Sequence, residues 1–139
     1  MRLLQFKIIH NIVATNANLN RWKIKDTKQC EFCQEIDTIE HMFSLCSKLR
    51  GFWDYVSSWI YCETHTKIKL STENIILGLL ASDFPNVKKT HLHMINHIIL
   101  IAKFSINKMR FGENKNVFII FDLEVSYRLN KEYYTQQNN

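Results

Sequence analysis

Glycine and proline are scarce in this chain, and their scarcity excludes several classes of fold. The 139 residues include three Gly and one Pro. The glycines, Gly51, Gly78 and Gly112, lie too far apart to form a dinucleotide-binding fingerprint or a phosphate-binding P-loop. A β-sandwich or barrel needs a turn about every 8–12 residues, and so few turn-forming residues disfavour it. The composition therefore favours helices and predicts a mostly α fold.

Long apolar runs are also missing. The longest uncharged apolar stretch, residues 92–102, is far shorter than the roughly 20 residues of a membrane span, and the N-terminal residues carry too much charge for a secretory signal. We therefore expect a soluble intracellular protein, nuclear or cytoplasmic or both, without a membrane partner. Thiols stay reduced there, so cysteines are expected to be metal ligands rather than to form disulfides. A formal net charge of +5 weakly favours an anionic partner.

Apolar residues that recur every three or four positions predict most of the helices. Asn16 or Asn18 is expected to cap the second of them, and Ser71 or Thr72 the fifth. Residues 117–121 alone would also fit a buried strand, and we favour a helix there. The predicted helical segments are residues 2–14, 19–22, 38–46, 47–61, 75–80, 90–110 and 116–134.

Three cysteines and one histidine have the spacing C-x2-C-x7-H-x4-C, at Cys30, Cys33, His41 and Cys46. Two thiolates separated by two residues fit on one tight turn and occupy adjacent corners of a tetrahedron, which the second pair completes. Soft sulfur together with one imidazole selects zinc over magnesium or calcium. Four protein ligands leave no position for water. The pattern therefore predicts one structural Zn²⁺ rather than a hydrolytic one.

Ordinary burial is the alternative for these four residues. Cys46 lies on an apolar stripe, and cysteine is among the most buried residue types. Cys30 and Cys33 lie in a polar segment without apolar periodicity, which favours the metal site. His41 and Cys46 are five residues apart, about 140° around an ideal α-helix. Both can face one metal only if the helix breaks, and we expect this break just before Ser47.

Basic and aromatic side chains surround the cysteine motif. Basic groups neutralise phosphates, and aromatic faces stack on unpaired bases. Phe32 is the better stacking candidate, whereas Trp22, at a helix end, is expected to be a core residue. A solvated basic face without any nucleic acid is the alternative. The candidate nucleic-acid contacts are Arg21, Lys23, Lys25, Lys28, Phe32, Lys48 and Arg50.

No group of residues in the sequence predicts a catalytic site. Metal-dependent nucleotidyl transfer needs two carboxylates close together, and the aspartates are all isolated in the sequence. The histidines at positions 91, 93 and 97 lack the glutamate of the H-E-x-x-H motif. Cys62 and His65 are interpreted as a spare thiol and a loop histidine. We therefore expect no enzyme and no small-molecule substrate.

Five parts of the sequence form a further pattern: Leu4 to Ile12, Thr15-Asn16 with Leu19 and Trp22, Cys30-x2-Cys33, Thr38-x2-His41-Met42-Phe43-x2-Cys46, and Phe52-Trp53 with Trp59. Together they resemble the reverse-transcriptase zinc-binding domain at the C-terminus of LINE-type non-LTR retrotransposon polyproteins. The resemblance covers residues 3–62 well and continues loosely to the tail at Tyr133 and Tyr134. It implies that the same four residues coordinate the metal. It also implies that the chain is a piece of a larger protein, with endonuclease and polymerase domains upstream.

The sequence predicts two segments of the chain and leaves two functions open. Residues 1–62 should form the zinc-binding module, and residues 63–139 a helical segment that packs with it as one domain or stands apart. The resemblance implies a non-catalytic module that helps to hold template RNA or target DNA, with the polymerase domain and nucleic acid as partners. The alternative is a structural or protein-interaction module that packs against the parent polymerase through an exposed apolar stripe of the 90–110 helix, or an inactive retrotransposon relic.

Overall fold

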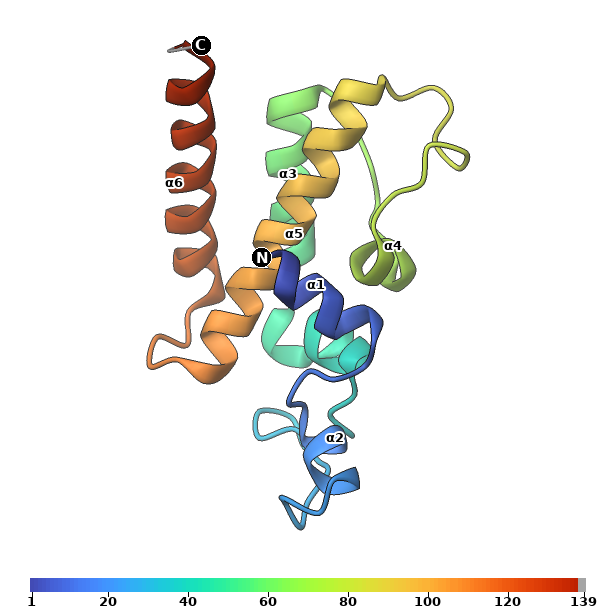
Figure 1. The fold of residues 1–139 in the computed structure, drawn as a ribbon, viewed down its shortest axis with the longest axis vertical. Helices are drawn as coiled ribbons and strands as arrows, with labels where there is room; N and C mark the ends of the chain where they lie inside the picture. Colours follow the sequence, from blue (N-terminus) through green and yellow to red (C-terminus); the bar gives the residue numbers. More distant parts are fainter. Residues whose placement is uncertain (138–139) are drawn as a thin grey trace.

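The computed structural model describes the backbone of residues 1–137 and the side chains of residues 1–130. Helices dominate this part of the chain (Figure 1), and within it the only β pairing is an isolated antiparallel bridge between Gln29 and Ile36. The predicted mostly α fold is confirmed. The elements are α1 (Arg2–Ile9), α2 (Asn16–Arg21), the π-helical turn η1 (His41–Leu45), the 3₁₀ turn η2 (Ser47–Leu49), α3 (Phe52–Thr64), α4 (Thr72–Leu77), α5 (Lys89–Phe111) and α6 (Val117–Gln137).

Helix α1 is shorter than the predicted helix over residues 2–14. The chain turns at Asn11, whose φ is 52°. The buried Asn18 side chain donates hydrogen bonds to the carbonyl oxygens of Asn11 and Val13, at 3.1 and 2.8 Å. These bonds hold the turn, and Ile12 is left 44% exposed rather than on a buried stripe.

The cap of α2 is Thr15, so the prediction of Asn16 or Asn18 was wrong. Thr15 Oγ1 accepts a hydrogen bond from the Asn18 backbone N–H at 3.2 Å. The two asparagine side chains make tertiary contacts instead, and the Asn16 amide donates to the Gln29 carbonyl at 2.7 Å. At α4 the expected cap is confirmed, because Ser71 forms a capping box.

Two breaks divide the apolar segment that precedes and includes α3. The first, at Cys46, is where the ligand spacing requires it, and Cys46 has extended backbone angles. The second is Gly51, which has a φ of 75°, a conformation open to glycine at little cost. Ser47 therefore begins only the short η2 rather than the predicted long helix, and α3 starts at Phe52.

The core lies between α3, α5 and α6. Helix α5 confirms the predicted 90–110 helix, and α6 confirms the helical reading of residues 116–134; the side chains of Tyr133 and Tyr134 are outside the described residues. Phe52 and Phe121 are fully buried, with their rings edge to face at 5.7 Å. The apolar stripe of α5 is buried as well. It is therefore not the exposed partner surface that the alternative function expected.

A buried lysine joins α1, α4 and α5. Lys103 is 2% exposed, and its ammonium donates to Gln5 Oε1 at 2.5 Å and to the Ile76 carbonyl at 3.1 Å. The Gln5 amide donates to the same carbonyl at 3.1 Å. Burial lowers the pKa of Lys103 from its ordinary 10.5 to about 8. Three helices are thus held together around one cationic group.

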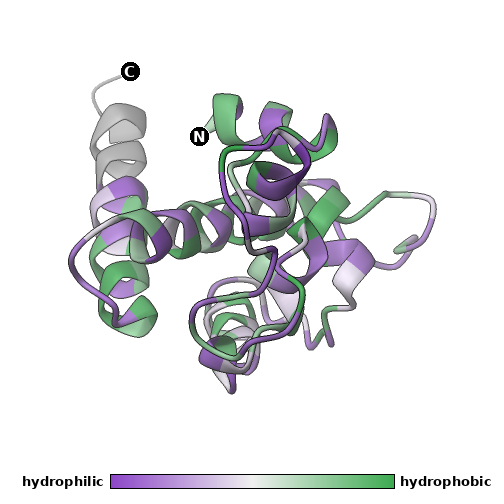
Figure 2. Ribbon diagram, turned by 90° about the horizontal axis from the view of Figure 1, so that it is seen from below, coloured by the Kyte–Doolittle hydropathy of each residue, from purple (hydrophilic) through white to green (hydrophobic). Residues whose placement is uncertain are grey.

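The helices carry hydrophilic and hydrophobic residues side by side (Figure 2), as expected of helices that each bury one face. Among the described residues, no helix combines the length and the hydropathy needed to cross a bilayer.

Candidate metal centre

Cys30 and Cys33 lie on a tight hairpin over residues 28–37, which we name the knuckle. The Asp37 N–H donates to the Lys28 carbonyl at 2.9 Å, and the Cys30 N–H donates to the Glu35 carbonyl at 2.6 Å. At the turn, the Gln34 N–H donates to the Cys30 carbonyl at 3.0 Å. These bonds satisfy the backbone of a polar segment that has no apolar periodicity, and they bring both cysteines to one side of the hairpin.

His41 and Cys46 come from η1 and the break that follows it. The Cys46 N–H donates to the His41 carbonyl at 2.9 Å, so the two residues close a five-residue π turn rather than a four-residue α turn. Single π turns often occur at functional sites. The His41 N–H donates to Thr38 Oγ1 at 3.2 Å, which fixes the start of this segment. The wider turn and the break place the two side chains on the same side, although an ideal α-helix would separate them.

The four candidate ligand atoms lie within 4.8 Å of one another. Cys46 Sγ is 3.8 Å from Cys30 Sγ and 3.9 Å from Cys33 Sγ, and Cys33 Sγ is 3.2 Å from His41 Nε2. Sulfurs bound to one tetrahedral zinc at about 2.3 Å are about 3.8 Å apart. The two sulfur–sulfur distances therefore fit zinc, and the residues present are suited to hold it.

The protonation of His41, Cys46 and Cys33 has clear physical causes. Burial lowers the pKa of His41, which favours the neutral imidazole that a metal ligand requires. Burial raises the pKa of the Cys46 thiol, and the charges of Cys30 and Cys33 raise it further. For Cys33, burial opposes ionisation, but hydrogen bonds led by the Glu35 backbone outweigh it and lower the pKa. Three thiolates at this distance from one another call for a compensating cation, and a divalent metal supplies it.

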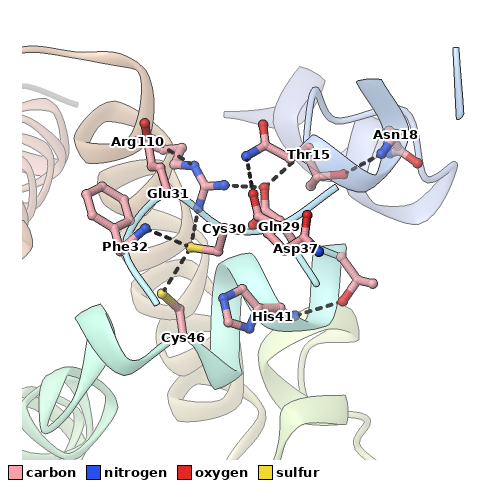
Figure 3. A network of polar contacts seen from close by, with 12 residues as sticks. Thr15, Asn18, Gln29, Cys30, Glu31, Phe32, Asp37, His41, Cys46 and Arg110 are labelled. Carbon is pink, nitrogen blue, oxygen red and sulfur yellow. Dashed lines mark hydrogen bonds and ion pairs between the residues drawn. The ribbon is translucent and has the colours of Figure 1, made fainter. Parts of the chain in front are cut away.

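A buried ion pair joins the knuckle to the end of α5 (Figure 3). Arg110, from the end of α5, forms a hydrogen bond and an ion pair with Asp37, which is fully buried. The Asn16 backbone N–H donates to the same carboxylate oxygen at 2.7 Å. Arg110 also reaches the metal site, since its Nη1 lies 3.8 Å from Cys30 Sγ. Sequence reasoning missed this pair because nothing in the local pattern marks two residues 73 positions apart as partners.

The predicted nucleic-acid contacts fall into two groups. Arg21, Lys23, Lys25 and Lys28 are all exposed on the end of α2 and the loop that leads to the knuckle, and we name this segment the basic loop (residues 21–29). It lies at the end of the molecule away from α3 and α6 (Figure 1). Lys48 and Arg50 are exposed beside the knuckle, on and just after η2.

Of the two aromatic candidates, Trp22 rather than Phe32 is the more exposed, which is the reverse of what the sequence predicted. Trp22 is 40% exposed, so the prediction of a core residue was wrong; it follows the last residue of α2, where the chain turns away from the core. Phe32 is half-buried, with Lys48 Nζ at 5.5 Å and Arg110 Cζ at 5.6 Å from its ring centroid. Its ring already contacts two cations and is less open to a base than Trp22. Cys62 is exposed and is not part of the four-ligand cluster.

Residues 1–53 match the model of a protein family described as zinc-binding in reverse transcriptase. No curated protein and no solved structure matches the chain. The matched segment includes all four candidate ligands and the basic loop, whereas α5 and α6 lie beyond it. Residues 1–53, in which three cysteines and one histidine gather into a single candidate metal-binding cluster, are therefore similar to the family that binds zinc in reverse transcriptases.

Proposed function

We propose that the chain is a non-catalytic module with one structural Zn²⁺ that helps a non-LTR, LINE-type reverse transcriptase to hold its RNA template or DNA target. The family match of residues 1–53 supports the reverse-transcriptase context. Four ligands from the protein would fill a tetrahedral metal, so the metal's chemistry here is to stabilise structure. Nucleic acid, the polymerase domain of the parent protein, and an intracellular setting in the nucleus or cytoplasm belong to the same proposal.

The basic loop is the observation that carries the nucleic-acid part. None of its four cations is ion-paired with a carboxylate among the described residues, so they remain available to phosphates. The loop is also held in place. The Asn20 amide donates to the carbonyls of Lys25 and Asp26, both at 3.1 Å, and Lys25 Nζ donates to Asn16 Oδ1 at 3.1 Å. A preorganised loop loses less entropy on binding than a mobile one.

Replacement of two lysines of the basic loop should flatten the salt dependence of binding. Each phosphate contact on a single strand contributes about 0.7 to the slope of log K against log salt. Lys23→Ala/Lys28→Ala should therefore reduce that slope by about 1.4. The measurement is fluorescence anisotropy with labelled single-stranded RNA and DNA over a salt series, with zinc bound.

Lys67→Ala is the matched control, because Lys67 is an exposed lysine on the connection between α3 and α4. It should leave the slope unchanged. Equal slopes for the wild type and the double variant, or no binding by the wild type at low salt, would refute the nucleic-acid part of the proposal.

Trp22 should contribute by stacking on a base. The Arg21 guanidinium lies 5.7 Å from the centroid of the Trp22 ring, and 40% of the residue is open to solvent. Loss of one aromatic stacking partner costs about 1–3 kcal/mol per base. Trp22→Ala should therefore weaken binding to single-stranded RNA by about that amount, whereas Trp22→Phe should retain most of the affinity. Equal affinities for the alanine and phenylalanine variants in the same anisotropy assay would show that stacking is absent.

A protein-binding module is the second candidate, and a different surface supports it. Leu3, Phe6 and Ile9, all on α1, are 65%, 52% and 58% exposed. Exposed apolar patches on a soluble domain often mark protein interfaces. This function would give negligible binding to RNA and DNA in the salt series, together with self-association of the isolated chain.

A further inference from the structure

Arg110 contacts both Asp37, at the end of the knuckle, and the candidate metal ligand Cys30. The residue is 7% exposed, and its guanidinium lies between Cys30 and Asp37 and contacts both (Figure 3). One terminal nitrogen is paired with Asp37 and the other is 3.8 Å from Cys30 Sγ, while Nε is 3.9 Å from Glu31 Oε1. A planar guanidinium presents its N–H donors in a rigid fork, so it can hold partners on two sides in fixed directions, whereas an ammonium is a compact point charge on a flexible stem.

The charges around the metal centre explain why a cation is needed there. Three thiolates with Zn²⁺ and a neutral imidazole carry a net charge of −1, and Cys30 and Cys46 are 0% and 5% exposed. Asp37 adds a second buried negative charge nearby, at 0% exposed. Buried charges are tolerated only when they are paired and hydrogen-bonded. Arg110 is the buried cation that contacts both negative groups in the described part of the chain.

We infer that Arg110 is a positioning residue of the metal centre, and that α5 completes a zinc site whose four ligands all lie within residues 1–53. The guanidinium donates toward the Cys30 thiolate and stabilises its negative charge, while its pairing with Asp37 fixes its direction. Outer partners of metal ligands typically change metal affinity by about 10–100-fold. The inference rests on metal binding at the four ligands and is independent of nucleic-acid binding.

A comparison of two variants of the full chain separates this role from simple pairing with Asp37. Asp37→Asn removes the buried negative charge and leaves Arg110 in place. Asp37→Asn/Arg110→Met removes both charges, so neither is left unpaired, and we expect this variant to fold. Zn²⁺ affinity is measured by competition with a chromophoric chelator, and the thiolate-to-metal charge-transfer band is recorded with Co²⁺ as the probe. Arg128→Met is the control, since Arg128 pairs with Glu124 on α6, outside the metal centre.

The double variant should bind Zn²⁺ about tenfold more weakly than Asp37→Asn. Its Co²⁺ charge-transfer band should move to longer wavelength, because a thiolate without a donor releases electron density more readily. Arg110→Lys keeps a cation for Asp37 but not the fork, and it should show the same band shift with native helicity. Equal affinities and identical bands for the single and double variants would overturn the inference. Failure of the wild type to bind either metal would overturn its premise, whatever the salt series shows for RNA and DNA.

Discussion

Chelation of the metal is expected to unfold the knuckle and the basic loop while leaving α5 folded. A structural zinc of this kind contributes on the order of 10 kcal/mol to the folding of its domain. The knuckle depends on it because residues 28–37 are mostly polar, and only Cys30 and Asp37 among them are buried. The core around Phe52 and Phe121 does not contain the metal and should persist. Hydrogen exchange after treatment with a strong zinc chelator should rise over residues 23–37 and remain slow in α5.

Two cysteine substitutions test whether the effect belongs to the metal. Cys30→Ser should reproduce the chelated state in the presence of zinc, because Cys30 is a buried member of the cluster. Cys62→Ser removes the exposed thiol outside the cluster and should behave as the wild type does. Unchanged helicity and unchanged exchange after chelation would contradict the structural role of the metal.

Lys103→Met is expected to stabilise the protein at neutral pH. The pKa of Lys103 falls from 10.5 in the unfolded chain to about 8 in the folded one, a shift that corresponds to a penalty on the order of 3 kcal/mol for keeping the ammonium charged. Methionine has a similar length and no charge. Some of the gain is lost with the hydrogen bonds to Gln5 and Ile76, so about 3 kcal/mol is the upper limit.

The stability difference between Lys103→Met and the wild type should decrease as the pH rises. Below pH 8 the lysine is charged in both states, and the full penalty is present. Between pH 8 and 10.5 the unfolded chain holds the proton that the folded chain has lost, so the wild type gains stability from this group as the pH rises. The advantage of Lys103→Met in guanidinium unfolding should therefore be large at pH 7 and small at pH 10.5. A difference between the two proteins that is the same at both pH values would show that the charge carries no penalty.

Much of the candidate metal centre could be predicted from the sequence, because its four ligands lie close together in the chain. The spacing of Cys30, Cys33, His41 and Cys46 indicated the cluster, and the five-residue interval between the last two required a break that the structure contains. The long helices could be predicted as well, since α5 and α6 repeat apolar residues over five or more turns. These features depend on neighbours in the chain rather than on distant partners.

The features that sequence reasoning missed depend on tertiary contacts or on a single backbone residue. Nothing near Arg110 or Lys103 indicates that these cations are buried, because their partners lie on other elements. The spacing of apolar residues predicted one helix from Ser47 to residue 61. This segment contains Gly51, whose left-handed backbone conformation ends the helical path and cannot be seen in the spacing of apolar residues. Trp22 has a large apolar side chain of the kind that is usually buried. It follows the last residue of α2, however, and is exposed there.

The contacts between α5 and the N-terminal segment predict the order in which parts of the chain fold. The two cysteines that approach to 3.8 Å, Cys30 and Cys46, are 16 residues apart in the chain, whereas Cys30 and Arg110 are 80 apart and Gln5 and Lys103 are 98 apart. Long-range contacts close larger loops and form late, and domains emerge from the ribosome N-terminus first. The knuckle can therefore capture its metal while α5 is still being synthesised. Docking of α5 then brings Arg110 against Cys30, so we expect exchange of a bound metal to become slow only after α5 has docked.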